Sequence, residues 1–388
     1  MLLLVRKTRT NNGVIYMIIM DLKVDNFYAF KKFHLNFSYP KKIVGNTLGE
    51  ETLSGCPNFR YRRVNIVMGA NATGKTSLGD LFNSIFFFID EKNVTSLTST
   101  IANTKKKAQF VIELIVREKI LYRIDCRVAA SREGKYTSDE VMVHVVSTSI
   151  GESDTYETCK NRLNALENDS FAEDYIHELE KVQGLSWCFE YPMDMDNTFE
   201  APASEALFLK IANKVMRALD PSILAVDKLE ALQDGYVIRT ESKEIILKGG
   251  EPFNTKYLSS GTKAGVGVTS ILTNMLMGGY GFFYCDEKFS YIDSEIEKAV
   301  LSIMIEKLPQ DSQLFFTTHN IEILDMDLPK HTYMFLKKDS TKNNAISCIL
   351  ASDILKRNTD SLRRAVENDL LATLPSVDLI YELEEIEV

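Results

Sequence analysis

The chain has 388 residues, of which 45% are hydrophobic and 26% charged, as in soluble globular proteins large enough for two lobes. Its net charge of -9 argues against a dedicated nucleic-acid coat protein, although basic clusters at 60–63 and 105–107 leave DNA contact open. Its six cysteines form no CxxC pair, which indicates neither a zinc site nor a disulfide framework. Without a secretory signal or a run near the roughly 18 apolar residues of a membrane span, we expect a cytoplasmic protein with no membrane partner.

The N-terminal half predicts mainly strands. We set residues 1–19 aside as an extension or an upstream start, because the first strand-like pattern follows them. Alternation over 22–38 predicts two strands around a turn. An apolar strand is expected over 64–68, then a glycine-containing loop, a helix, and an antiparallel meander over 110–150.

The C-terminal half predicts a helical lobe followed by alternating helices and strands. From residue 151 to about 219, apolar positions recur at spacings of three and four, which is typical of helices. A hairpin is then expected over 237–250. It is followed by a helix over 266–277, a strand over 281–285, a helix over 294–307 and a strand over 313–319.

The segment GANATGKT, residues 69–76, matches G-x-x-x-x-G-K-[ST] between the expected strand and helix. Its glycines let successive N–H groups face phosphate oxygens, Lys75 would lie along the β- and γ-phosphates, and Thr76 would ligate Mg²⁺. A chance glycine turn before a helix is the alternative. The residues expected to bind ATP here are Gly69, Asn71, Ala72, Thr73, Gly74, Lys75, Thr76 and Ser77.

The segment GFFYCDEKFSYID, residues 281–293, places two acids after a very apolar strand. Such a strand is typical of a buried parallel sheet, whose carboxyl edge forms ligand sites. Asp286 would then orient Mg²⁺, and Glu287 would align or deprotonate the water that attacks the γ-phosphate. Two acids at a strand end are also common as ordinary surface residues, so this assignment depends on the phosphate loop.

The segment LFFTTHN, residues 314–320, is another apolar strand with a polar end. With one helix between them, this strand and the preceding one should be parallel and adjacent. His319 would then reach the γ-phosphate or the attacking water. The alternative is a structural histidine at a strand end.

The polar turn YLSSGTKAG, residues 257–265, opens a helix between the phosphate loop and the acidic pair. This order of motifs resembles the ABC ATPases, including their SMC, Rad50 and RecF branch. The resemblance implies that Ser259, Ser260 and Gly261 form the signature that covers ATP held by a second chain, and that Asp293 is the D-loop aspartate. It implies a homodimer that closes head to tail over two ATP molecules, with Glu287 and His319 as catalytic residues; higher oligomers stay open.

The expected fold class is therefore α/β, an ABC-ATPase head with a mixed sheet, an antiparallel meander and a helical second lobe. We assign residues 20–150 and 278–388 to the first lobe and 151–277 to the second. No Q-loop glutamine can be assigned between Gln109 and Gln183. The absence of a long heptad run excludes SMC arms, and Lys288 stands where transporter subunits usually carry proline.

Residues 22–37 look like the opening hairpin of RecF- and SMC-type heads. The tail at 359–378 is similar to stand-alone bacterial ATPases of the AAA15 or AAA21 type, many of which serve phage-defence systems such as PARIS, AbiL-type and Septu. This implies a sensor ATPase that responds to a phage trigger protein and controls a separate effector, such as a Toprim or HNH nuclease. The alternative is a RecF-like DNA-repair ATPase that clamps DNA. A transporter subunit or a purely structural role fits the motifs less well.

Overall fold

The structure is a computed structural model of the whole chain. It describes residues 5–6, 17–39, 48–49, 51–117, 119–131, 133–166, 174–191, 204–232, 235–248, 251–252, 259–287, 289, 292–339, 344–357, 360–371 and 381. Most of the tail at 372–388 lies outside the described residues, as do residues 257 and 258 of the expected signature.

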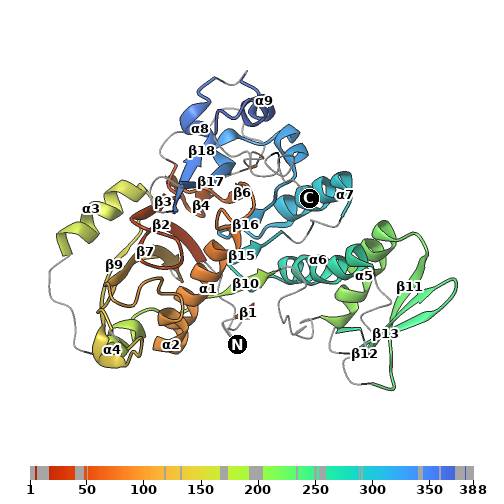
Figure 1. Cartoon of the computed structure of the whole chain (residues 1–388), viewed down its shortest axis with the longest axis horizontal. Helices are drawn as coiled ribbons and strands as arrows, with labels where there is room; N and C mark the ends of the chain where they lie inside the picture. The colour runs from red at the N-terminus through yellow and green to blue at the C-terminus, as the bar shows by residue number, and fades with distance from the viewer. Residues whose placement is uncertain are drawn as a thin grey trace, which may run out of the picture.

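A seven-stranded mixed sheet runs through the centre of the molecule (Figure 1). Its central strands are parallel neighbours, and the two edge strands pair antiparallel. In sheet order the strands are β1 (Val5–Arg6), β10 (Trp187–Glu190), β15 (Phe282–Cys285), β16 (Gln313–Thr317), β6 (Val64–Met68), β17 (Tyr333–Asp339) and β18 (Ala345–Leu350). The predicted parallel pairing of the strands before the acidic pair and before His319 is therefore confirmed.

Helices cover both faces of this sheet, which is why its central strands are apolar without alternation. Helix α1 (Lys75–Glu91) packs on one face against Phe282, Tyr284 and Phe315. Helices α6 (Ser260–Met277) and α7 (Ser294–Lys307) pack on the other. The segment expected as the helix 294–307 has the predicted bounds, whereas α6 begins six residues before the expected 266, because Ser259 caps it.

The predicted antiparallel meander is confirmed as part of a five-stranded sheet. Its order is β3 (Phe33–Asn36), β2 (Met17–Asp25), β7 (Ala108–Val116), β8 (Ile120–Val128) and β9 (Val141–Ser149). Setting residues 17–19 aside was wrong, because they begin β2 and are completely buried. The Gln313 side chain ties them to the central sheet through the Ile19 N–H and carbonyl, at 2.9 and 3.2 Å.

The helical lobe expected from residue 151 begins later in the structure. Helices α3 (Tyr156–Leu166) and α4 (Tyr175–Glu180) contact β9 of the meander, and β10 lies inside the central sheet. Tyr156, Cys159 and Leu163 bury one face of α3 in a core shared with β2 and β7. The periodicity of residues 156–166 and 175–180 therefore reflects packing on the first lobe.

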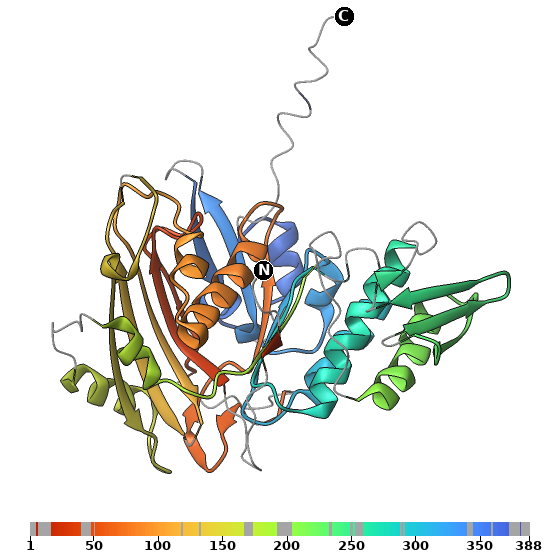
Figure 2. The same cartoon turned by 90° about the horizontal axis from the view of Figure 1, so that it is seen from below.

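The second lobe projects to one side of the molecule beyond α6 (Figures 1 and 2). It contains α5 (Glu205–Leu219) and a four-stranded sheet of β11 (Ile223–Lys228), β12 (Gly235–Thr240), β13 (Glu244–Lys248) and β14 (Glu251–Pro252). The predicted hairpin is β12–β13. Phe208, Ala212 and Met216 of α5 pack against this sheet, so the lobe has a core of its own.

Short elements complete the fold. They are β4 (Thr52–Leu53), β5 (Cys56–Arg60), α2 (Val94–Thr98), α8 (Ala351–Ile354), α9 (Leu362–Glu367) and the 3₁₀ turns η1 (Ser138–Glu140), η3 (Ile321–Asp325) and η4 (Lys330–Thr332). Within the described ranges, no helix combines the length and apolar character that crossing a bilayer requires.

Candidate functional site

Four parallel strands end at one edge of the central sheet. Because β10, β15, β16 and β6 point the same way, the residues that follow them meet there. These residues are Tyr191, the pair Asp286 and Glu287, the segment 318–319, and the loop that starts at Gly69. Ligands of open α/β sheets bind at this edge. The structure thus brings together the three predicted motifs that follow strands.

The loop after β6 has the backbone that its glycines permit. Gly69 has φ 153° and Gly74 has φ 99°, while Ala72 adopts φ 61°. A side chain at Gly69 would come within 2.5 Å of the Leu336 carbonyl oxygen, and one at Gly74 would collide with Ile346. The predicted residues 69–77 therefore form a tight loop that opens α1, a geometry that cradles phosphate groups.

Lys75 lies across this loop with only 4% of its surface exposed. Its Nζ donates to the carbonyl oxygens of Gly69 and Ala70 at 2.7 and 3.1 Å. The same ammonium lies 2.9 Å from Glu287 Oε1. The hydroxyl of Tyr284 donates to the Lys75 carbonyl oxygen at 2.6 Å, which fixes the start of α1 to β15. The cation that would hold phosphates therefore also contacts the predicted catalytic acid.

Thr76 and Asp286, the residues predicted to bind Mg²⁺, are in direct contact. The Thr76 hydroxyl donates to Asp286 Oδ2 at 2.6 Å, and Asp286 is completely buried. Burial raises the pKa of Asp286, and hydrogen bonds from Thr317 and Thr76 oppose that rise. One carboxylate and one hydroxyl suit Mg²⁺, which usually takes few protein ligands and completes its shell with phosphates and water. Throughout the described ranges, no cluster of three or more His, Cys, Asp or Glu side chains is placed to hold a metal ion.

Glu287 has a strained backbone that a neighbouring strand supports. Its φ of 36° is unusual for a residue with a side chain. Its N–H donates to Thr317 Oγ1 at 2.8 Å, and the Thr317 hydroxyl donates to Asp286 Oδ1 at 2.6 Å. The buried Thr317 hydroxyl therefore holds both the Glu287 backbone and the Asp286 carboxylate in position. Thr317 is not among the residues predicted from the sequence, although its place at the end of the adjacent parallel strand could have indicated it.

Asp293 and the two residues that flank His319 all hydrogen-bond to one buried acid on α7. His319 is exposed after β16. Asp293 caps α7 by accepting the Glu295 N–H at 2.9 Å. The acid is Glu297, which the sequence analysis did not consider; it binds the residues on both sides of His319.

The expected signature residues open α6. Ser259 caps this helix by accepting the Thr262 N–H at 3.0 Å. Ser259 and Ser260 are exposed, and Gly261 is half-buried. Among the contacts of the described residues, no hydrogen bond or ion pair joins these three to the loop at 69–77 or to the acidic pair. The structure of one chain therefore does not bring the signature to its own phosphate loop.

Neither candidate Q-loop glutamine belongs to this edge. Gln109 lies exposed in β7 of the meander, and Gln183 is exposed and donates to the Glu180 carbonyl oxygen at 3.4 Å. The residue after β10 is the buried Tyr191, which lies within electrostatic range of Asp80 on α1. Burial, as the main cause, raises the pKa of Asp80 to about 6. Asp80 follows Thr76 by one helical turn, so the two residues share one face of α1. This spacing could have indicated that Asp80 lies near the site.

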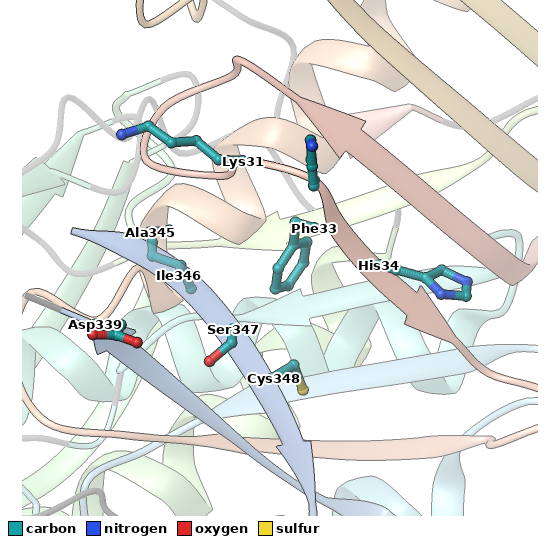
Figure 3. A pocket seen from close by; sticks show the side chains of 9 residues that line it. Lys31, Phe33, His34, Asp339, Ala345, Ile346, Ser347 and Cys348 are labelled. Atoms are coloured by element: carbon teal, nitrogen blue, oxygen red, sulfur yellow. The ribbon is translucent and has the colours of Figure 1, made fainter. Parts of the chain in front are cut away.

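A pocket of about 350 Å³ opens between β3 and β18 (Figure 3). Lys31, Phe33 and His34 line one side, and Ser347 lines the opposite side. Ile346 also lines it and is the residue that a side chain at Gly74 would strike. The pocket therefore adjoins the phosphate loop.

No protein-family model matches the chain, and no curated protein matches its sequence. Solved structures similar to it include an SMC head bound to the C-terminal winged-helix domain of ScpA, with 13% identity over 87% of this chain and 99% of that chain and a TM-score of 0.49. The SMC head domain from Thermotoga maritima has 14% identity over 86% of this chain and 98% of that chain, with a TM-score of 0.42. The recombination mediator protein RecF has 12% identity over 87% of this chain and 100% of that chain, with a TM-score of 0.45.

Proposed function

We propose that this chain is an ATP-binding and ATP-hydrolysing switch of the ABC type. The observation that carries the proposal is the set of contacts at the sheet edge, where Lys75 lies 2.9 Å from Glu287 and Thr76 lies 2.6 Å from Asp286. A lysine and a hydroxyl from a phosphate loop, beside two acids from a neighbouring strand, are the parts that phosphoryl transfer to water requires.

Each residue has one role in the proposed reaction. The loop N–H groups and Lys75 bind the β- and γ-phosphates. Mg²⁺, when bound by Thr76 and Asp286, would neutralise charge on the phosphates. Glu287 holds the attacking water in line with the γ-phosphate and accepts its proton. His319 hydrogen-bonds to the γ-phosphate or the water.

The pocket between β3 and β18 is the proposed site for part of the nucleoside. It adjoins the phosphate loop at Ile346, Lys31 supplies a cation, and Phe33 forms an apolar wall. An apolar wall with a few polar groups is typical of sites that hold a small ligand in one orientation.

We further propose that two chains close head to tail on ATP. Ser259 and Ser260 are exposed at the start of α6, next to the half-buried Gly261, and none of the three forms a described contact with the chain's own phosphate loop. A second chain would then present them to the γ-phosphate, together with Asp293. Because this contact forms only with a triphosphate, ATP would shift the population toward the dimer.

The biological role proposed for this switch is control of a separate effector in phage defence. Only the sequence resemblance to stand-alone defence ATPases supports it, which is an associational argument. Loss of plaque reduction when Lys75→Ala replaces the wild-type chain beside its effector would support this role. A RecF-like clamp instead predicts DNA binding that increases with ATP and decreases with salt. The net charge of -9 disfavours this alternative, because it repels the DNA phosphates.

ATP turnover and nucleotide affinity test the central proposal. Lys75→Ala should abolish turnover and weaken ATP binding by about tenfold or more, because a charged hydrogen-bond donor is lost. Lys105→Ala changes an exposed lysine in the turn before β7 and should alter neither quantity. A wild-type chain that hydrolyses no ATP, or a Lys75→Ala variant as active as the wild type, would contradict the proposal.

A further inference from the structure

Glu297 is a carboxylate on the buried face of α7. It has 3% of its surface exposed, and the next residues on the same face, Val300, Leu301 and Met304, belong to the core. The Glu297 N–H donates to the Asp293 carbonyl oxygen at 3.0 Å, so Glu297 lies in the first turn of the helix that Asp293 caps. A carboxylate in such a place is costly unless its oxygens are hydrogen-bonded.

Both oxygens of Glu297 bind the segment after β16. Thr318 Oγ1 donates to Oε1 at 2.8 Å, and Asn320 Nδ2 donates to Oε2 at 2.7 Å. These donors are the residues immediately before and after His319. One carboxylate on α7 therefore holds the backbone on both sides of the histidine.

Other bonds fix the orientation of each donor. The Thr318 N–H donates to the Val67 carbonyl oxygen at 3.1 Å, and Thr318 Oγ1 accepts the Asn320 N–H at 3.0 Å. Asn320 Oδ1 accepts the Glu322 N–H at 3.0 Å, so its amide cannot rotate without losing that bond. Burial raises the pKa of Glu297, and the bonds from Asn320 and Thr318 and the charge of His319 oppose that rise. His319 therefore lies within electrostatic range of this acid.

We propose that Glu297 is a positioning residue that fixes His319 relative to Asp293, so that the start of α7 and the histidine move as one unit. This rests on the proposed function, in which Asp293 faces the second chain and His319 faces the γ-phosphate. Closure of the dimer at Asp293 would then place His319 without a separate rearrangement. Glu297 itself touches neither ATP nor water in this scheme.

Glu297→Gln tests this role at nearly constant volume. Its single amide oxygen can accept from only one of the two donors. Turned toward Thr318, it leaves the amide nitrogen facing the Asn320 amide nitrogen, donor against donor; turned toward Asn320, it leaves the Thr318 hydroxyl proton without its acceptor. We expect turnover to fall by about tenfold to a hundredfold, because a small displacement of a catalytic group has effects of this size. ATP affinity should stay within about twofold, since Lys75 and the loop are unchanged. Glu306→Gln, at the exposed end of α7, should behave as the wild type.

Two combinations separate positioning from a general structural effect. Combining Glu297→Gln with Asn320→Asp restores a donor opposite an acceptor and should recover most of the turnover. In a His319→Ala background, Glu297→Gln should have no further effect on turnover, because it acts through the histidine. If Glu297→Gln does not fold, as judged by thermal unfolding, Thr318→Val removes one of the two donors and should give the same pattern.

The outcomes distinguish this inference from the function on which it rests. If the wild type shows no Lys75-dependent ATP turnover, both the proposed function and the positioning role of Glu297 are wrong. If that turnover is present but Glu297→Gln matches the wild type, or if the effects of Glu297→Gln and His319→Ala add, only the positioning role is overturned.

Discussion

Thr76 and Asp286, 210 residues apart in the chain, are joined by a hydrogen bond of 2.6 Å. The bond links the first turn of α1 to the end of β15 at the carboxyl edge of the sheet. Asp286 is completely buried, so its carboxylate is held in place by this bond and by the Thr317 hydroxyl. A hydroxyl and a carboxylate placed in this way are preorganised for a cation that also binds phosphates.

Glu287→Gln should separate ATP binding from hydrolysis. Glutamine keeps the size of the side chain but cannot accept the proton of the attacking water. We expect turnover to fall by about a hundredfold or more, with ATP affinity retained. The ATP-bound dimer should accumulate, which light scattering on a sizing column would detect. Equal turnover in the variant and the wild type, with monomers only, would rule out the role given to Glu287.

Gly261→Asp should leave ATP binding to one chain intact and abolish turnover. The reason is that the new carboxylate would face the γ-phosphate held by the other chain. Isothermal titration with ATP and a phosphate-release assay measure the two quantities. Loss of ATP binding in the isolated variant would place this turn elsewhere.

Mixing gives a control for this assignment. A mixed dimer of Gly261→Asp and Lys75→Ala chains contains one site in which both contributing surfaces are wild type. Two inactive variants should therefore regain partial activity on mixing. A mixture that stays inactive while mixed dimers form would argue against sites shared between chains.

Gly74→Ala should destabilise the fold more than an alanine at an ordinary turn glycine. Gly74 has φ 99°, and a side chain there would strike Ile346. Gly134, with φ 70°, has only Thr104 Cγ2 at 3.7 Å, and serves as the matched control. We expect a loss in the free energy of unfolding of about 1 kcal/mol for Gly134→Ala and of about 2–4 kcal/mol for Gly74→Ala. Urea unfolding compares them, and equal losses would contradict the close contact.

Asp80 should make stability depend on pH. Its folded pKa of about 6 lies above the ordinary 3.8, chiefly because of burial, so the folded chain binds this proton more tightly than the unfolded chain. The stabilising effect of the protonated form is present below pH 3.8 and is lost as pH rises through about 6.

Asp80→Asn introduces a neutral side chain of equal size, so the variant should not lose stability at this site as pH rises. Relative to the wild type, the variant should therefore gain about 1–2 kcal/mol of stability, as a larger free energy of unfolding, between pH 4 and pH 8. Denaturant titrations without nucleotide at both pH values measure the difference, with Asp139→Asn at an exposed position as control. A difference that does not change with pH would contradict the effect of burial.

The sequence by itself determined the elements that carry the site. The strand 64–68 and the helix 294–307 have the predicted bounds, because an apolar run between turn residues and a capped amphipathic pattern are local properties. The parallel pairing of β15 and β16 also followed from the chain, since one helix separates the two strands. The loop and the acidic pair lie together because β16 pairs in parallel with β15 on one side and with β6 on the other.

Only the tertiary structure decided which surfaces these elements cover. Residues 17–19 are core residues because both faces of β2 are buried, and α3 and α4 pack on the meander although their periodicity also suited a separate lobe. Thr317, Glu297 and Asp80 were missed because their significance depends on partners that are distant in the chain or on burial. A local pattern specifies the shape of a segment, whereas the contact that orients a side chain depends on which distant segment packs against it.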